Sequence, residues 1–209
     1  LDLRLRNYAE SDPERNLPWS AKSLRECYEL GAEKFGWKER RPGPGLTSRN
    51  GMQVGYGMAS SLYGFHRHPS KARAVMQADG SVIVQSATMD IGPGTGTAMT
   101  RIAAGVLGIS AKKIRFDLGH SAFPDAPGQN GSSTIPSVGS AVYAACEALK
   151  ARLVALAGEM SPAFKGVARP EVRDGKLFAS PQESEGLAYA DILKHHQLKE
   201  LDVTEESKS

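Results

Sequence analysis

Cysteine is scarce in this sequence, since Cys27 and Cys146 are the only two among 209 residues. Two separate thiols are too few to hold an iron–sulfur cluster, and they lack the CxxC spacing of zinc and redox sites. No run of the chain approaches the ~20 apolar residues that a membrane span requires. Both cysteines fall in helical patterns, so we expect them to be buried structural thiols.

An excess of charge of one sign is also lacking. The 26 basic and 23 acidic side chains are interspersed and leave a formal net charge of +3. A nucleic-acid-binding surface needs clustered Lys and Arg with aromatic residues between them, so this class is excluded. The phosphate-binding motif GxxxxGK[ST] and the GxSxG turn of serine hydrolases are absent as well.

The hydrophobic periodicity predicts a layered α/β (α+β) fold with a mixed sheet. Apolar residues on both sides of Asp79-Gly80 predict a hairpin, because Asp-Gly favours a two-residue turn. Strands are expected at 72–78, 81–86 and 113–117. Helices are expected at 20–37, 98–107 and 139–156, with Gly108 ending the second of these.

Two less regular stretches carry further expectations. Residues 52–62 are rich in glycine and small side chains, which is typical of a buried strand with close backbone neighbours. Toward the end of the chain, a hairpin around Asp174-Gly175 and a helix over 189–195 are followed by a charged, frayed tail.

The run Arg41-Pro-Gly-Pro-Gly45 is the best internal boundary. We therefore expect a helical segment (1–45), a core (46–165), and a small hairpin and helix with the charged tail (166–209). The chain starts at Leu1 in a stretch with the pattern of a helix interior, so we expect it to be a fragment of a longer polypeptide.

Two loops form the candidate site, because each ends where a helix is expected to begin. The glycine loop covers residues 87–97 and the serine loop covers residues 119–138. Unpaired backbone N–H groups and the helix dipole favour anions at such positions. Neither loop contains Lys or Arg, so neutral donors would hold a phosphate or a polar heterocycle. The candidate binding residues are Gly92, Gly94, Thr95, Gly96 and Thr97, then Gly131, Ser132, Ser133, Thr134, Ser137 and Gly139.

Two other interpretations stay open on these residues alone. The glycines can serve turns while hydroxyl side chains cap helices, with Thr97 and Ser137 or Ser140 as the N-caps. The glycines of the first loop, followed by Asp117 after the next strand, also mimic a Rossmann-like nucleotide-binding unit. Against the latter, Thr97 occupies the position of the third glycine.

The spacing of the histidines in the sequence does not indicate a metal site. His66 and His68 are two residues apart near a strand end, but no third ligand follows nearby. We expect them on the surface. His120, in the serine loop, is the histidine expected nearest to a ligand. No catalytic acid–base pair and no metal ligand is predicted.

Taken together, the two loops resemble the molybdenum-binding subunit of the xanthine dehydrogenase/aldehyde oxidase family. The first match is TMDIGPGTGT at 88–97, followed by RIAA at 101–104. The second loop matches through GHS at 119–121, PDAP at 124–127, GSST at 131–134 and PSVG at 136–139. The family's connecting segment is matched by residues 3–7, 12–13, 19–20 and 35–37.

The resemblance implies a molybdenum hydroxylase, which oxidises an aldehyde or N-heterocycle with oxygen taken from water. It implies molybdopterin, in the cytosine dinucleotide form, between the two loops, with Thr134 and Ser137 as the main hydroxyl contacts. It also implies partner subunits that carry 2Fe-2S clusters and FAD, a small-molecule substrate, and a cytoplasmic or periplasmic location.

Three departures from the family pattern bear on the site. Pro93 has no N–H to donate where Gln or Thr is common, His120 replaces an acidic or polar residue, and Gln129-Asn130 replaces a simpler glycine stretch. The resemblance places the catalytic glutamate outside this chain, nearer the C-terminus of the full subunit. We therefore expect the chain alone to be inactive and free of cofactor, with a non-enzymatic interaction domain as a further alternative.

Overall fold

The computed structural model describes residues 1–181 and 185–207, which form two compact units, Leu1–Leu62 and Tyr63–Ser209. The division between the two units falls after Leu62, and residues 52–62 contribute no strand to the four-stranded sheet of the second unit. The buried strand expected there is wrong. Within residues 52–62, only β4 (Met52–Gln53) is a strand, and most of these residues are exposed. Its glycines provide no side chains with which a strand could build a core.

The first unit is built on one helix, α2 (Leu24–Phe35), which ends at Gly36 in the left-handed conformation. Tyr28 and Ala32 are its buried residues, whereas Cys27 is exposed, so the expectation of two buried thiols is wrong for Cys27. The remaining elements are α1 (Asp2–Arg6), the turn η1 (Trp37–Glu39), and the two-residue hairpins β1 (Ser11–Asp12) with β2 (Leu17–Pro18) and β3 (Ser48–Arg49) with β4.

The second unit contains a four-stranded mixed sheet in the order β11-β5-β6-β7. The predicted hairpin between β5 and β6 is confirmed, but its turn is longer than the two residues expected, since β5 ends at Gln77 and β6 begins at Val82. β6 and β7 are parallel, and β11 and β6 are each antiparallel to β5. The strands cover Ser70–Gln77 (β5), Val82–Gln85 (β6), Ile114–Asp117 (β7) and Glu200–Ser207 (β11). The mixed sheet in an α/β layer arrangement agrees with the fold class predicted from the sequence.

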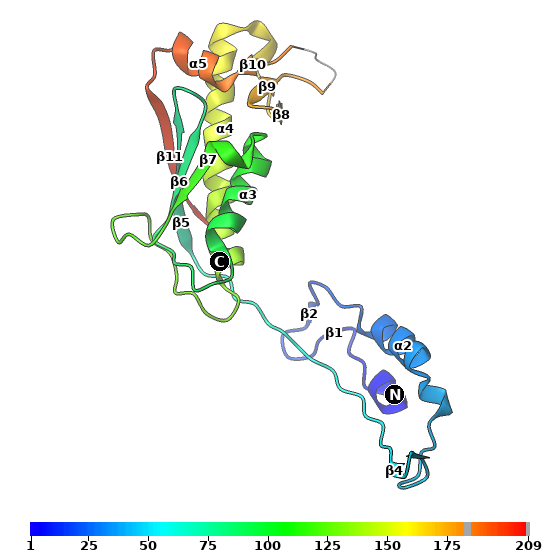
Figure 1. The fold of residues 1–209 in the computed structure, drawn as a ribbon. Helices are drawn as coiled ribbons and strands as arrows, with labels where there is room; N and C mark the ends of the chain where they lie inside the picture. Colours follow the sequence, from blue (N-terminus) through cyan, green and yellow to red (C-terminus); the bar gives the residue numbers. More distant parts are fainter. Residues whose placement is uncertain (182–184, 208–209) are drawn as a thin grey trace. The chain divides into compact units, whose positions relative to one another are not determined.

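Two helices, α3 (Thr95–Leu107) and α4 (Ser140–Met160), pack on one face of this sheet and against each other (Figure 1). The inward side chains of β5 alternate with outward ones, as expected for a strand with one covered face. In α4, Cys146, Leu149 and Leu153 are fully buried, and burial raises the pKa of the Cys146 thiol to about 12. Truncating such a leucine costs about 2–5 kcal/mol in well-packed cores.

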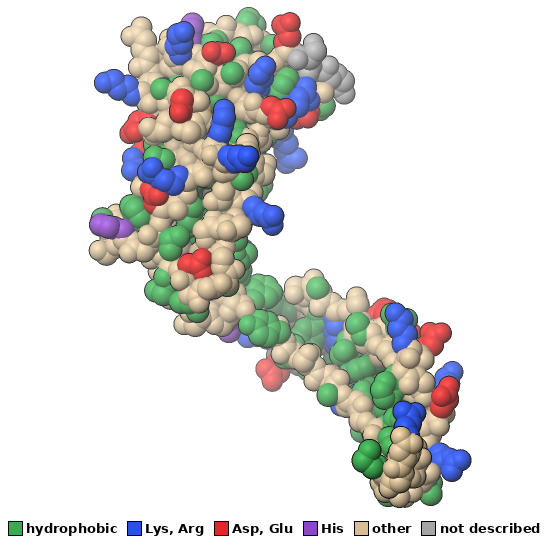
Figure 2. All heavy atoms as spheres, viewed as in Figure 1, with side chains coloured by type: hydrophobic (Ala, Val, Ile, Leu, Met, Phe, Trp, Pro, Cys, Tyr) green, Lys and Arg blue, Asp and Glu red, His purple; other side chains and the backbone are tan. Residues whose placement is uncertain are grey.

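The opposite face of the sheet carries a row of polar side chains. The Arg73 guanidinium donates to Asp202 on one side and to the Gln85 amide oxygen at 3.3 Å on the other. The Gln85 amide nitrogen donates to Asp117 at 3.4 Å. Figure 2 shows charges of both signs interspersed over the second unit, as the sequence composition indicates.

The charged end of the chain is not frayed as expected. β11 pairs with β5 along its whole length, from Glu200 opposite Gln77 to Ser207 opposite Ser70. Leu201 is buried against the helices, so a single apolar face anchors a strand whose other residues are mostly charged. The sequence did not predict this strand, because its many charged residues leave only a weak alternation of apolar and polar side chains over eight positions.

The remaining elements close the end of the unit that lies opposite the two loops. The predicted hairpin around Asp174-Gly175 joins β8 (Glu171–Arg173) to β9 (Lys176–Phe178), and α5 (Tyr189–His195) follows β10 (Leu187–Ala188). The buried Tyr189 hydroxyl donates to the Leu107 carbonyl at 2.6 Å. The short turns are η2 (Ala111–Lys113), the π-helical turn η3 (Ile135–Gly139) and η4 (Pro162–Phe164). No helix among the described residues is long and apolar enough to cross a membrane.

Substitution by alanine should change the stability of the chain in opposite directions at Gly105, inside α3, and at Gly108, the C-cap of α3. Gly108 has φ 59° and a Cβ there would lie 2.6 Å from the Val172 carbonyl oxygen, so Gly108→Ala should lower the free energy of unfolding by about 1–3 kcal/mol. Gly105 lies inside the helix with open space around it, so Gly105→Ala should raise it by ~0.5–1 kcal/mol. Urea unfolding of both variants measures the difference, and equal effects would contradict this account of the helix end.

Candidate functional site

The glycine loop is closed by the carboxylate of Asp90. Its Oδ1 accepts hydrogen bonds from the backbone N–H groups of Gly92 at 2.9 Å and Gly94 at 3.3 Å. These two glycines have φ of 119° and 85°, which L side chains rarely adopt, and Gly94 is the N-cap of α3. The Gly92 bond is the main cause that lowers the pKa of Asp90. The start of α3 therefore already holds an anion that belongs to the chain.

Thr97 is not the N-cap that the capping interpretation expects. α3 begins at Thr95, so Thr97 lies inside its first turn and is exposed. The other proposed caps also fail, because the turn η3 runs directly into α4 without a break and places Ser137 and Ser140 within the helical run. The Ser140 hydroxyl donates to the Pro136 carbonyl, one turn earlier in the same helical run, at 2.6 Å.

The glycine and serine loops are joined by Gln129. Its amide oxygen accepts a hydrogen bond from the Ile91 N–H at 3.1 Å, and its amide nitrogen donates to the Thr95 hydroxyl at 3.0 Å. Thr95 is only 2% exposed, so its side chain is committed to this contact. The two loops that the sequence identified separately are thus brought together in one site.

A tight turn at the tip of the serine loop is held by its own hydroxyl groups. Ser133 is buried, and its hydroxyl donates to the Gly128 carbonyl at 3.2 Å while its N–H donates to Asn130. Gly131 and Ser132 follow one another with φ of 51° and 55°. The Ser132 hydroxyl then donates to the Tyr63 hydroxyl at 2.7 Å, which fixes a residue outside both loops beside the tip.

Between the two loops lies a hollow of about 440 Å³, which we call the loop hollow. Thr134 lies on its wall, 9% exposed, and the hollow contains no charged side chain. The backbone at Gly131 approaches closely, since a Cβ there would lie 2.9 Å from the His66 ring. The lining residues are Tyr63, Ile91, Pro93, Gln129, Asn130, Gly131, Ser132, Ser133, Thr134 and Ile135.

Two of the expected contact residues have internal partners instead of facing the hollow. Ser137 is fully buried, and its hydroxyl oxygen accepts a hydrogen bond from the His68 N–H at 2.9 Å. Gly139 is buried where α3 and α4 meet, and a Cβ there would lie 2.8 Å from Ile102. In this structure both residues hold the start of α4 in place.

Some residues of the site were missed or undervalued by the sequence reasoning. Tyr63 lies outside both loops and no local motif marks it. Asp90 follows the pattern of an Asx turn before Gly92, which is a usable signal. Gln129 was visible as a departure from a glycine stretch, but its two partners are 34 and 38 residues away.

Other candidate groups lie apart from the hollow. His120 is exposed and its ring nitrogen accepts from the Ala122 N–H at 3.1 Å. Within the described part of the chain, no three His, Cys, Asp or Glu side chains are grouped as a metal site. A Gly-Glu pair occurs at 158–159, but it lies at the far end of α4, where Glu159 faces His196 at 3.8 Å.

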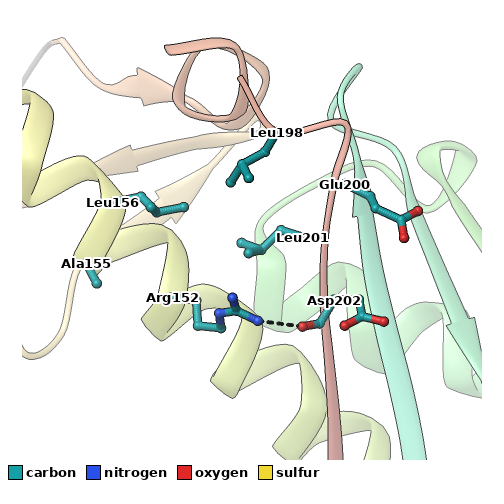
Figure 3. A pocket seen from close by; sticks show the side chains of 7 residues that line it. All are labelled: Arg152, Ala155, Leu156, Leu198, Glu200, Leu201 and Asp202. Carbon is teal, nitrogen blue, oxygen red and sulfur yellow. Dashed lines mark hydrogen bonds between the residues drawn. The ribbon is translucent and has the colours of Figure 1, made fainter. Parts of the chain in front are cut away.

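A second hollow, of about 490 Å³, lies between α4 and β11 (Figure 3). The Arg152 guanidinium donates to the Asp202 carbonyl at 2.7 Å across it. Its other lining residues are Leu and Ala side chains together with Glu200 and Asp202, and no nucleophile lines it. The two carboxylates belong to no group of three metal-ligating side chains among the described residues. The second hollow therefore offers no chemistry comparable with the loop hollow.

Comparison with known families gives a match over most of the chain. The model of the molybdopterin cofactor-binding domain matches residues 30–208. The aldehyde oxidoreductase molybdenum-binding subunit PaoC of Escherichia coli K12 is 31% identical over 185 residues, which is 88% of this chain and 25% of PaoC. The putative xanthine dehydrogenase subunit XdhA of the same strain is 28% identical over 55% of this chain and 16% of XdhA.

Solved structures give the same fold. CO dehydrogenase of Oligotropha carboxidovorans aligns over 100% of this chain and 30% of its own, with a TM-score of 0.71 at 18% identity. The aldehyde oxidoreductase of Desulfovibrio desulfuricans aligns over 99% of this chain and 21% of its own, with a TM-score of 0.57 at 19% identity. The chain spans a quarter or less of the curated relatives it matches.

The Asp90 contacts predict a pH-dependent contribution to stability. Because the folded state lowers the pKa of this carboxyl, its contribution is complete above the ordinary carboxyl pKa and is lost as the pH falls through the lowered value. Asp90→Asn should therefore be less stable than the unchanged chain at neutral pH and equal to it in strong acid. Urea unfolding over a pH series measures this. Asp79→Asn, in the β5–β6 turn, is the matched comparison, because the pKa of this carboxyl is also lowered by hydrogen bonds within its own turn, and it should lose stability with the same dependence on pH. Equal stability of Asp90→Asn and the unchanged chain at neutral pH would contradict this account.

Proposed function

Because the chain belongs to the molybdopterin cofactor-binding domain family, we propose that its two loops hold the pterin cofactor of a molybdenum hydroxylase. One observation carries this assignment beyond the family match. The two loops that the family motif identifies line one hollow and are joined by hydrogen bonds of a single side chain. The lining has the donor chemistry that a polar, phosphate-bearing heterocycle needs.

The residues around the loop hollow fit such a group. The backbone N–H groups of Gly131, Ser132 and Thr134 lie at the start of the helical run formed by η3 and α4, where an anion is favoured. The absence of a side chain at Gly131 lets the His66 ring lie close to the backbone there, since a Cβ would be 2.9 Å from that ring. These backbone N–H groups are suited to a ligand that accepts hydrogen bonds from neutral donors.

The negative charge of Asp90 makes the glycine loop less suited to a phosphate than the serine loop. The Asp90 carboxylate already engages the amides of Gly92 and Gly94, and the amides of Thr95 and Gly96 also contribute to lowering its pKa. A second anion at the start of α3 would meet this negative charge. We therefore assign the phosphate end of the cofactor to the serine loop, with Thr134 as a hydroxyl donor, and a neutral edge of the pterin to the glycine loop.

For the whole protein we propose the corresponding enzyme. When bound, the cofactor supplies the molybdenum at which such enzymes hydroxylate an aldehyde or an N-heterocycle with oxygen from water. We assign the cofactor the cytosine dinucleotide form, the electron acceptors 2Fe-2S and FAD to partner subunits, and the assembly to the cytoplasm or periplasm. Residues 46–165 would supply the cofactor contacts, 1–45 the connecting segment, and 166–209 structural support.

A nucleotide-binding module of the Rossmann type is the weaker alternative. Such a unit needs a free carboxylate after the second strand to bind a ribose hydroxyl. Asp117 occupies that position at the end of β7, but its two carboxylate oxygens accept from Arg115 at 2.9 and 3.1 Å, and one also accepts from Gln85. Its bonds on the polar face of the sheet leave it no role in ribose recognition.

The proposal is tested by substituting Thr134 in the complete subunit. Thr134→Val keeps the shape and removes the hydroxyl, so cofactor affinity should fall by roughly tenfold for the loss of one hydrogen bond to a charged group. Molybdenum per mole of purified protein is the measurement. Thr204→Val, on the exposed face of β11, is the control and should retain full molybdenum. A complete subunit that contains no molybdenum before any substitution would refute the proposed function.

A further inference from the structure

Gln129 occupies the point where the two loops touch at the hollow. We infer that Gln129 is a positioning residue that sets the separation of the glycine and serine loops across the loop hollow. The inference rests on the proposed function for its ligand and on the hydrogen bonds of Gln129 for its geometry.

The two hydrogen bonds of Gln129 involve both the oxygen and the nitrogen of its side-chain amide. The oxygen accepts from a backbone N–H, at Ile91, and the nitrogen donates to a side-chain hydroxyl, at Thr95. An amide reversed by half a turn would place its nitrogen against the Ile91 N–H, so the pair of partners fixes the orientation. Both partners flank the Gly92–Gly94 turn, one before it and one after it.

The other links between the loops lie at their bases. Backbone bonds join Ala87 to Pro124 and Gly119 to Thr88, each at 2.8 Å. Gln129 joins the tip of the serine loop both to Ile91 in the glycine loop and to Thr95 in the first turn of α3. Removing these two hydrogen bonds would leave the bases tied and would free the tips that line the hollow.

Gln129 also completes the set of internal partners of the glycine turn. Asp90 accepts from Gly92 and Gly94, and Gln129 accepts from Ile91. The turn is therefore shaped before any ligand arrives, which lowers the ordering cost of binding. A ligand between the loops would depend on this spacing even without touching Gln129.

Three variants separate positioning from general stability. Gln129→Ala removes both bonds. Gln129→Glu can keep both, because a carboxylate accepts from the Ile91 N–H and from the Thr95 hydroxyl, but it adds negative charge beside the hollow. Gln85→Ala is the matched control, since Gln85 also uses both ends of its amide, between Arg73 and Asp117 on the far face of the sheet.

The first readout is amide hydrogen exchange in the 209-residue chain, measured by NMR. Exchange at Ile91 should rise by about tenfold in Gln129→Ala, and should stay near the original rate in Gln129→Glu and in Gln85→Ala. An Ile91 rate in Gln129→Ala that matches the control would overturn the inference.

The second readout is molybdenum content of the complete subunit. Gln129→Ala and Gln129→Glu should both lose molybdenum several-fold, while Gln85→Ala retains it. Full molybdenum in Gln129→Ala, together with faster exchange at Ile91, would show that the bridge orders the loops without serving the cofactor, and would overturn the positioning role. A wild-type subunit without molybdenum would instead refute the proposed function, while the exchange result would still report on the bridge.

Discussion

Close packing of α3 against the start of α4 is the contact on which the site depends. Gly139 makes it possible, because its missing side chain leaves room for Ile102 of α3, and a Cβ there would lie only 2.8 Å from that side chain. Each helix begins where one of the two loops ends. Holding the helix starts together on one face of the sheet therefore brings both loops to the same hollow.

The chain satisfies many of the helix-start donors with its own groups. Asp90 and Gln129 bond the glycine turn, Ser133 bonds the serine turn, and Ser137 anchors the extended segment at His68. This internal bonding preserves the shape of both loops, so the donors that remain for a ligand are few and well placed. The shape of both loops is thus set by contacts within the chain, and no metal-ligand cluster occurs in the described part of the chain.

Local sequence signals predicted the elements that local chemistry determines. The Asp79-Gly80 hairpin, the end of α3 at Gly108, the hairpin at Asp174-Gly175 and α5 are confirmed, because each follows from turn residues or helical periodicity. β11 was missed because its pairing with β5 joins residues more than a hundred positions apart. The strand expected at 52–62 was wrong because glycine-rich sequence alone does not show what a strand would pack against.

For the candidate site too, some features could be predicted from the sequence and others could not. Motif and family resemblance located both loops, but the roles of individual residues depended on contacts that no spacing reveals. Ser137 looked like a free hydroxyl and is buried against His68, whereas Gln129 looked like a departure and joins the loops. Tyr63 had no signal, since only the folded chain brings it to Ser132.

The central claim is that one cofactor lies between the two loops. A crystal structure of the complete subunit purified with its molybdenum cofactor tests it most directly. The account predicts phosphate oxygens within hydrogen-bond distance of the backbone N–H groups of Gly131, Ser132 or Thr134. It also predicts a pterin edge beside the Gly92–Gly94 turn, with Asp90 still bonded to the amides of that turn. A cofactor bound elsewhere in the subunit, with the loop hollow filled by other protein side chains, would contradict it.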